Sequence, residues 1–498
     1  MAEGIKNLAK DTAIYGVSSI VGRLLNWLLT PMYVRMFTES DNGIITNLYS
    51  WVALLFVILT YGMETTFFRY IYEKNTTNTN GVYATALSAL ASTSALFIGL
   101  IVLFLTPISK YLEYSDHKDY IMIMAVIIAI DAFCAIPFAY LRYKKRAIKF
   151  ATLRLFNVGA IIFFNLFFII ACPWIYEKAP ALISWFYNPD YGVGYVFVSN
   201  LIASSIILLS LIPDMSGLKS KADWSLLKKM LKYTYPILIL GIAGQANKTI
   251  GTILFPMLFD DQQREFADAQ LGIYGACLKL AMVIVMFNQA FRFAYEPIVF
   301  AKSKGADNKV LYSEAMKYFI IFSLLIFIGV MFYIDIFKLL VTPEYYVGLP
   351  VVPLVMMGET FFGIYFNLSL WYKLIDKTEW GAYFSFTGLA ITIAILVAFV
   401  PVYGFMACAW ASLICNLVMM LASYFIGQKK YPIKYDLKSF FIYFSLAMVL
   451  YAIGMYLPID NLFLKLAART GLLFIYIAFM VKRDLPLSHV PIINKFIK

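Results

Sequence analysis

Cationic side chains lie deep inside apolar stretches of this sequence. Arg23 lies in the middle of the first stretch, and Lys248 and Lys279 lie within later ones. A charged group is costly in hydrocarbon, so it normally faces a partner or a water-filled cavity. Two roles fit these residues: structural ion pairs with acids on neighbouring helices, or a solvated cationic cavity that binds an anion. A repeat in the sequence, described below, favours the cavity.

Three carboxylates lie in the same kind of setting. Asp131, Glu359 and Glu64 each fall within an apolar stretch. They could neutralise the buried cations, or they could bind and release H⁺ or Na⁺ as their surroundings change. Charge balance and ion coupling therefore both stay open for these three residues. We expect no other cofactor and no metal site.

Two Arg-Glu pairs have the spacing of helical neighbours. Arg69 and Glu73 are four residues apart, as are Arg292 and Glu296. An exposed pair of this kind within one helix contributes only a few tenths of a kcal/mol. A second hypothesis is a cytoplasmic gate, in which Glu73 and Glu296 exchange arginine partners as the protein closes. In that scheme Arg69 and Arg292 also contact an anionic cargo.

Most of these residues recur in a long internal repeat, whereas Glu64 and Lys279 have no repeat partner. Gly16, Arg23 and Pro31 return at a constant offset as Gly241, Lys248 and Pro256, and the hexads 68–73 and 291–296 share their Arg and Glu. The segment 131–138 likewise matches 359–366, so that Asp131 corresponds to Glu359. Internal repetition indicates the architecture of a fold. Here it predicts two related halves that each supply one set of charges.

The elements that carry these residues must be membrane helices. Of 498 residues, 62% are hydrophobic and 14% are charged, whereas soluble domains have about 25% charged residues. A helix needs roughly 20 apolar residues to cross a bilayer. The sequence predicts an all-α polytopic protein with fourteen such stretches: 12–36, 43–71, 83–108, 119–141, 150–172, 193–213, 232–258, 270–298, 313–340, 350–372, 380–400, 403–426, 438–457 and 461–481.

Basic residues gather in alternate loops, for example at 142–149 and 302–309. Because cytoplasmic loops are enriched in Lys and Arg, both termini are expected in the cytoplasm. The net charge of +12 is then a topology signal and not a nucleic-acid footprint. We expect an N-terminal half at 1–215 and a parallel, pseudo-symmetric half at 216–427. Residues 428–498 then add two helices and a cytoplasmic tail.

Several other classes of protein are excluded. The five cysteines fall in or beside apolar stretches without metal-site spacing, and the two histidines are far apart. No phosphate-cradling Walker motif and no glycosyltransferase or ligase signature occurs, so we expect a protein that is not an enzyme. We also expect no cleaved signal peptide, because the first apolar stretch contains Arg23.

The first hairpin carries a family resemblance in Gly22-Arg23-Leu24-Leu25, Pro31 to Arg35, Asp41-Asn42-Gly43-Ile44, Tyr61-Gly62-Met63 and Phe68-Arg69-Tyr70. With fourteen helices, it resembles the oligosaccharide flippase branch of the multidrug/oligosaccharidyl-lipid/polysaccharide exporter superfamily, with an acidic-x-Gly turn before the second helix. The resemblance implies translocation of undecaprenyl-diphosphate-linked oligosaccharides for O-antigen, polysaccharide or lipopolysaccharide synthesis. It places the protein in the bacterial cytoplasmic (inner) membrane.

The resemblance also bears on the cargo and its competitors. Lipid II flippases share the cationic cavity, but their second helix usually ends in a proline-containing run that 67–72 lacks. Multidrug exporters of the superfamily typically have twelve helices and cavities led by carboxylates, whereas we expect this chain to be a polysaccharide exporter and an antiporter. A diphosphate is well held by Arg and Lys. Expected partners are a lipid-linked oligosaccharide, membrane lipids and polysaccharide polymerases or glycosyltransferases, but no nucleic acid, with the monomer as the functional form.

Overall fold

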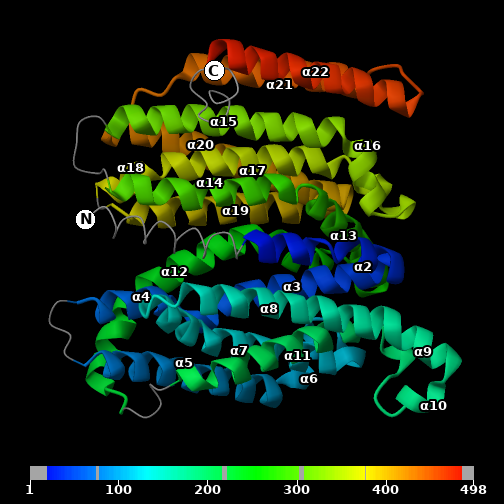
Figure 1. Cartoon of the computed structure of the whole chain (residues 1–498), viewed down its shortest axis with the longest axis vertical. Helices are drawn as coiled ribbons and strands as arrows, with labels where there is room; N and C mark the ends of the chain where they lie inside the picture. The colour runs from blue at the N-terminus through cyan, green and yellow to red at the C-terminus, as the bar shows by residue number, and fades with distance from the viewer. Residues whose placement is uncertain (1–19, 74–77, 216–220, 302–307, 376, 485–498) are drawn as a thin grey trace. The chain divides into compact units, whose positions relative to one another are not determined.

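The computed structural model describes residues 20–73, 78–215, 221–301, 308–375 and 377–484, and these segments form helices and connecting turns without a strand (Figure 1). Within them, twelve helices are long and apolar enough to cross a membrane. Arg264–Leu280 and Met282–Phe293, bent by 50° at their junction, count as one more span when taken together. These thirteen correspond to the second to fourteenth predicted stretches. The all-α polytopic fold is confirmed. Of the first predicted stretch, 12–36, the structure describes residues from 20 on, which are helical at 20–27 and 30–36.

The chain divides into two compact units. Unit 1 comprises Met1–Gly275 and Thr392–Cys408, and unit 2 comprises Ala276–Ile391 and Ala409–Lys498. These units are defined by packing, whereas the halves 1–215 and 216–427 follow from the sequence repeat, which stays a prediction. The helices of unit 1 are α2 (Thr30–Met36), α3 (Glu39–Thr60), α4 (Met63–Ile71), α5 (Thr79–Leu103), α6 (Leu105–Tyr111), α7 (Lys118–Tyr143), α8 (Ala147–Leu166), α9 (Cys172–Lys178), α10 (Pro180–Ile183), α11 (Gly194–Leu211) and α12 (Trp224–Leu254).

The second predicted helix consists of two helices. A capping box starts α3: the Thr38 side chain accepts from the Asp41 backbone N–H, and Asp41 accepts from that of Thr38. The expected turn at Asp41–Ile44 is therefore the first turn of α3. The helix ends where Tyr61 and Gly62 adopt positive φ angles of 36° and 73°, and α4 follows at once. A Cβ on Gly62 would lie 2.5 Å from the Ile237 side chain, so this break needs glycine.

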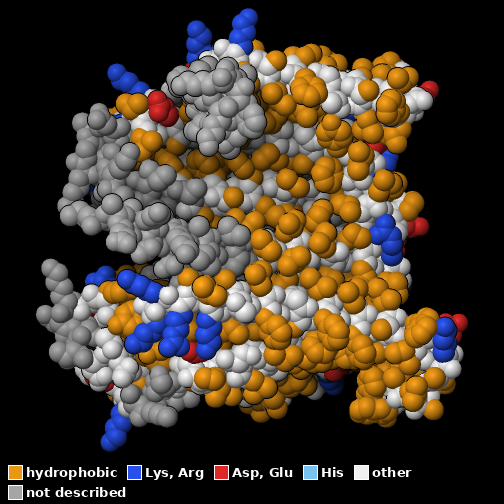
Figure 2. Space-filling view, in the orientation of Figure 1, with side chains coloured by type: hydrophobic (Ala, Val, Ile, Leu, Met, Phe, Trp, Pro, Cys, Tyr) orange, Lys and Arg blue, Asp and Glu red, His pale blue; other side chains and the backbone are white. Residues whose placement is uncertain are grey.

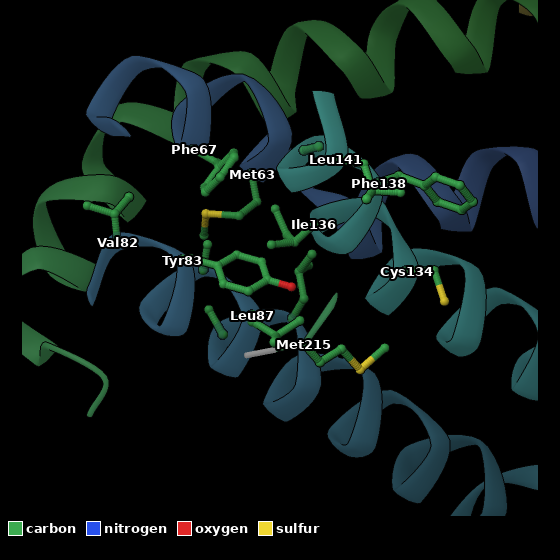
Figure 3. Packing of buried hydrophobic residues seen from close by; sticks show 14 of the residues in the cluster. Met63, Phe67, Val82, Tyr83, Leu87, Cys134, Ile136, Phe138, Leu141 and Met215 are labelled. Carbon is green, nitrogen blue, oxygen red and sulfur yellow. The ribbon is translucent and has the colours of Figure 1, made fainter. Parts of the chain in front are cut away.

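An apolar cluster fixes α4 in place. Met63 and Phe67 of α4 are fully buried against Tyr83 and Leu87 of α5 and Ile136 of α7 (Figure 3). Because apolar burial is the main favourable term in such packing, the face of α4 opposite to this cluster is left to polar residues. Glu64 and Arg69 are accordingly not buried.

Unit 2 is built around α15. Its helices α17, α21 and α22 all pack on α15, and α14 packs on both α15 and α17. Two helices, α19 and α20, cross the division between the units, as does α13 (Arg264–Leu280). The bounds are α14 (Met282–Ala301), α15 (Asn308–Phe332), α16 (Ile334–Phe337), α17 (Val351–Leu368), α18 (Leu370–Leu374), α19 (Glu379–Tyr403), α20 (Phe405–Lys430), α21 (Leu437–Met455) and α22 (Leu462–Arg483).

The surface is apolar along the helices and basic at one end of unit 1. Figure 2 shows hydrophobic side chains over most of the helix surface and a group of Lys and Arg where α4 ends and α8 begins in Figure 1. The last turn of α7 and the loop that leads to α8 hold four exposed cations, namely Arg142, Lys144, Lys145 and Arg146. This is the pattern of a polytopic membrane protein with a basic loop at a membrane surface.

Candidate functional site

The ten predicted site residues divide between the two units. Arg23, Glu64, Arg69, Glu73, Asp131 and Lys248 belong to unit 1, and Lys279, Arg292, Glu296 and Glu359 belong to unit 2. The side chains of Arg23, Lys248 and Lys279 are exposed although their helices carry apolar stretches. An exposed cation on such a helix is what a polar cavity requires. The roles assigned to these residues stay predictions.

Glu64 has a partner on a neighbouring helix. Its carboxylate forms an ion pair with Arg142 near the end of α7, and both side chains are a little over 40% exposed. The Arg142 guanidinium also lies 4.9 Å from the centre of the Phe68 ring. The pair therefore joins α4 to α7 and balances the charge of Glu64.

Asp131 lies on α7 beside a cation that the sequence analysis did not single out. Its carboxylate interacts with the Ser204 hydroxyl on α11 and electrostatically with Arg154 on α8. Arg154 interacts with Glu64 as well. In the described part of unit 1, Asp131 thus has its positive partner in Arg154. Arg154 follows the basic 142–149 loop closely in sequence, and its position inside the fifth predicted helix was the signal that could have identified it.

The Arg154 guanidinium rests on aromatic rings. Its central carbon lies 4.1 Å from the centre of the Phe138 ring and 5.6 Å from that of Phe150, while its side chain is exposed. A cation–π contact attracts the guanidinium to the ring face without neutralising its charge. Because the ring accepts no conventional hydrogen bond, the guanidinium can still donate to an anion.

Unit 2 holds a cation–aromatic site at the repeat-equivalent position. In the sequence repeat, Phe366 on α17 corresponds to Phe138 on α7. The Arg292 guanidinium lies 4.7 Å from the Phe366 ring centre, and the Lys373 ammonium lies 4.6 Å from it. Each unit therefore places cationic groups over the phenylalanine that lies seven residues after its acid.

The acid of unit 2 also contacts a polar neighbour. The Asn288 side-chain amide on α14 donates to the Glu359 backbone carbonyl at 2.9 Å and approaches its carboxylate at 3.4 Å. Asn288 and Arg292 are one turn apart on α14, so this helix brings an amide and a guanidinium to the same face of α17. The side chain of Glu296 lies outside the described residues.

Arg69 contacts an aromatic ring and not Glu73. Its guanidinium lies 4.2 Å from the centre of the Tyr233 ring on α12, and Glu73 is exposed just beyond the end of α4. Among the ion pairs of the described residues, none joins Arg69 to Glu73. Glu73 still interacts with Arg69 electrostatically. The within-helix pair and the gate both remain hypotheses.

Metal chemistry finds no support in the described segments. They contain no group of three or more His, Cys, Asp or Glu side chains that could hold a metal ion. The five cysteines are all buried as free thiols.

The fold is that of membrane transporters. It resembles the lipid II flippase MurJ in an inward closed conformation, with a TM-score of 0.72 and 15% identity over 95% of this chain and 99% of that one. It also resembles an inward-facing multidrug resistance MATE family transporter of the MOP superfamily, with a TM-score of 0.65 and 12% identity over 82% and 94% of the chains. A Vibrio cholerae MATE transporter matches with a TM-score of 0.55 and 14% identity over 88% and 98%.

The family follows from the sequence itself. A family described as "Polysaccharide biosynthesis protein" matches residues 8–295, which is more than half of the chain. The chain therefore belongs to this polysaccharide biosynthesis family, and the predicted resemblance to the exporter superfamily is confirmed. A comparison with curated protein sequences finds none that matches.

Proposed function

We propose that this protein is a flippase that moves undecaprenyl-diphosphate-linked oligosaccharides from the inner to the outer leaflet of the bacterial cytoplasmic membrane. It serves the synthesis of cell-surface polysaccharide or lipopolysaccharide, and it works by alternating access. Both termini are cytoplasmic in this proposal. The family and the transporter fold support a flippase or exporter, and the site chemistry favours a lipid diphosphate as the cargo.

One observation carries the choice of cargo. Arg154 in unit 1 and Arg292 with Lys373 in unit 2 are held over repeat-equivalent phenylalanines. A diphosphate carries several negative charges, and charge-assisted hydrogen bonds to Arg and Lys are among the strongest that a protein offers. The aromatic rings hold these cations in place without neutralising their charge. A cationic drug would be repelled by the same groups.

The carboxylates supply the other half of the mechanism. Asp131 attracts Arg154 when no cargo is bound, and the cargo's phosphates compete for the same guanidinium. Protonation of Asp131, or Na⁺ at its carboxylate, would weaken its hold on Arg154 and favour cargo binding. Binding energy that differs between two conformations is what shifts their equilibrium. In this proposal, Asp131 and Glu359 are therefore the residues that couple transport to H⁺ or Na⁺.

Two alternatives have specific support. The resemblance to MurJ favours lipid II, another lipid-linked diphosphate, as the cargo. The resemblance to MATE transporters favours cation-coupled drug export. Lipid II is disfavoured as the cargo because Phe67–Tyr72 contains no proline. Drug export is disfavoured because the cations of the cation–π sites would repel a cationic drug.

A complementation experiment separates the three functions. The gene is expressed in strains that lack the polysaccharide flippase, the lipid II flippase or the main drug exporters, and each rescue is scored. We expect rescue of polysaccharide export alone. Arg154→Ala should strongly reduce this rescue, whereas Lys144→Ala, a change in the exposed loop, should not. Restored drug tolerance or restored growth without lipid II flippase would overturn the proposal.

A further inference from the structure

A helical hairpin extends from the far end of α8. The π-helical segment Phe167–Ala171 joins α8 to α9 without a break, and α10 begins directly after Ala179. We call residues 172–187 the α9–α10 hairpin. Figure 2 shows it as a hydrophobic lobe at the end of unit 1 away from the basic loop, where Figure 1 places α9 and α10. The proposed function gives this hairpin no role.

The hairpin has a small core of its own. Ile183 and Tyr187 are buried together with Phe168 at the end of α8 and Tyr195 on α11. The Tyr195 ring stacks on the rings of Phe168 and Tyr187, with 5.0 Å between the ring centres in each case. The Asn188 backbone N–H donates to the Tyr195 hydroxyl at 2.7 Å. These contacts fix the hairpin on α8 and α11, so its outer face has a defined direction.

The outer face of the hairpin is apolar and continues the lipid-facing side of α8. Trp174, Leu182 and Trp185 are 58%, 68% and 82% exposed. Exposed apolar residues spaced three or four apart, and therefore on one side of the helix, lead to this face: Phe163, Leu166, Ile170 and Trp174. Because α8 belongs to an apolar span, this stripe faces lipid tails along most of its length.

The length of this helical run sets the depth of the hairpin. Ala147–Lys178 contains 32 residues and is therefore roughly 48 Å long. The hydrocarbon core of a bilayer is only about 30 Å thick, or about 40–45 Å with its head groups. Arg146 and Lys149 place the start of α8 at one membrane surface. The hydrocarbon then ends about 20 residues further on, close to Phe167, and α9 lies among the head groups.

The second arm of the hairpin returns to the same depth. The Phe186 ring stacks on the Phe167 ring with 6.4 Å between their centres, and the Trp185 ring lies 4.7 Å from that of Phe186. Trp185 is therefore close to the level at which the hydrocarbon ends. The charged residues Glu177 and Lys178 lie at the turn, further from the hydrocarbon. Tryptophan is enriched at membrane interfaces, where its ring has both apolar and polar surroundings.

We propose that the outer face of the α9–α10 hairpin binds the membrane at the boundary between head groups and acyl chains, with Leu182 and Trp185 inserted there. With the predicted topology, this is the outer leaflet. A lipid surface fits better than a sugar or a soluble protein, because the face continues a lipid-facing stripe and no charged residue occurs between Arg154 and Glu177. The hairpin thereby anchors the depth of α8. The inference does not depend on the cargo.

Spin-label accessibility measures this depth directly. Leu182→Cys and Trp185→Cys each carry a nitroxide in the full-length protein, in nanodiscs of phosphatidylethanolamine and phosphatidylglycerol; the five native cysteines are buried. Collisions with O₂, which concentrates in hydrocarbon, and with a water-soluble nickel chelate are compared. Phe163→Cys on the lipid-facing stripe and Lys144→Cys in the exposed loop are the references. At both hairpin positions we expect an O₂-to-nickel ratio between the two references, with nickel collisions several-fold rarer than at Lys144→Cys.

A matched control lies on the hairpin itself. Glu177→Cys, at the exposed turn, should be nearly as accessible to nickel as Lys144→Cys. Each labelled protein is first shown to be monodisperse with an unchanged melting temperature, and Leu182→Cys carries the test if Trp185→Cys is not. A ratio at Leu182→Cys equal to that of Lys144→Cys or Glu177→Cys would leave the face in water, open to a sugar or a protein, and a ratio equal to that of Phe163→Cys would place it in hydrocarbon. Either result overturns the inference, and neither affects the flippase proposal.

Discussion

At the scale of single residues, the site consists of charges held by aromatic rings and by one another. Arg154 contacts Phe138 and interacts with both Asp131 and Glu64, and Glu64 pairs with Arg142. Acid and base therefore alternate across α4, α7 and α8. In the proposed function, cargo phosphates entering this arrangement would displace carboxylates from the cations, so substitutions of these charges should alter cargo binding.

Arg154→Ala should reduce polysaccharide export by roughly 10- to 100-fold, because one charge-assisted hydrogen bond contributes about 1.5–3 kcal/mol. Arg154→Lys keeps the charge and should retain part of the export. Surface polysaccharide is measured at matched protein levels, with Lys144→Ala as the control. Full export in Arg154→Ala would remove Arg154 from the site.

The Glu64–Arg142 pair should contribute little to stability. Both side chains are more than one third exposed, so solvent screens the pair. A double-mutant cycle with Glu64→Gln and Arg142→Gln should give a coupling free energy of about 0.2–1 kcal/mol. Unfolding of the detergent-solubilised protein provides the measurement. A coupling of several kcal/mol would show that the pair is shielded from water.

At the scale of elements, the two added helices are fastened to α15 at both ends. At one end, Arg469 is 1% exposed and donates to the Gly454 and Phe332 carbonyls at 2.9 and 3.1 Å and to Asp335 at 2.8 Å. At the other, Asp484 accepts from Lys317 at 2.9 Å and from Tyr443 at 2.7 Å. These contacts join α15, α21 and α22 at both ends.

Arg469→Met should destabilise this element by about 3–5 kcal/mol, because it strips a partner from a charged cluster and leaves buried carbonyls unpaired. Lys465 also pairs with Asp335 but its side chain is 26% exposed, so Lys465→Met should reduce stability much less. Limited proteolysis between α21 and α22 and thermal unfolding report the effect. If Arg469→Met and Lys465→Met lowered stability equally, burial of Arg469 would not be the cause of its larger predicted effect.

Acid should loosen the same element. Burial opposes ionisation of Asp335, but hydrogen bonds from Lys338 and Arg469 and the charges of Lys338 and Lys465 outweigh it and lower the pKa below the ordinary 3.8. The pKa of Asp484 is lowered as well, by Tyr443 and Lys317 against the effect of burial. Because both folded pKa values are depressed, the stabilisation is complete above about pH 4 and is lost as pH falls below it. Proteolysis at pH 3 and pH 6 measures this, and Asp335→Asn should reduce the difference.

At the scale of the whole molecule, topology is the open prediction with the clearest test. The basic loop after α7 is expected in the cytoplasm and the Asp260-Asp261 turn outside. All five native cysteines are buried, so single cysteines at Lys145 and Gln262 should report with little background. Membrane-impermeant labelling of intact cells should modify Gln262→Cys alone. Modification of both from the same side would reject the topology.

The sequence alone determined the helical, membrane-spanning class, the positions of thirteen of the fourteen spans, and the family. These features are local: a run of apolar residues long enough to cross a bilayer needs no partner to be recognised, and repeats and motifs are read along the chain. The break at Tyr61-Gly62 and the capping box of Thr38 were harder to predict from the sequence, because they shift the ends of a helix without changing the apolar pattern.

Only the tertiary structure decided which charges meet. Asp131 lies beside Arg154 and Glu64 pairs with Arg142, and in each case the partner belongs to another helix. Residues four apart on a helix are neighbours, and this spacing suggested the pair of Arg69 and Glu73. Tertiary packing instead brings the Tyr233 ring to Arg69, and an aromatic face close by attracts a guanidinium that an exposed, solvated glutamate holds only weakly.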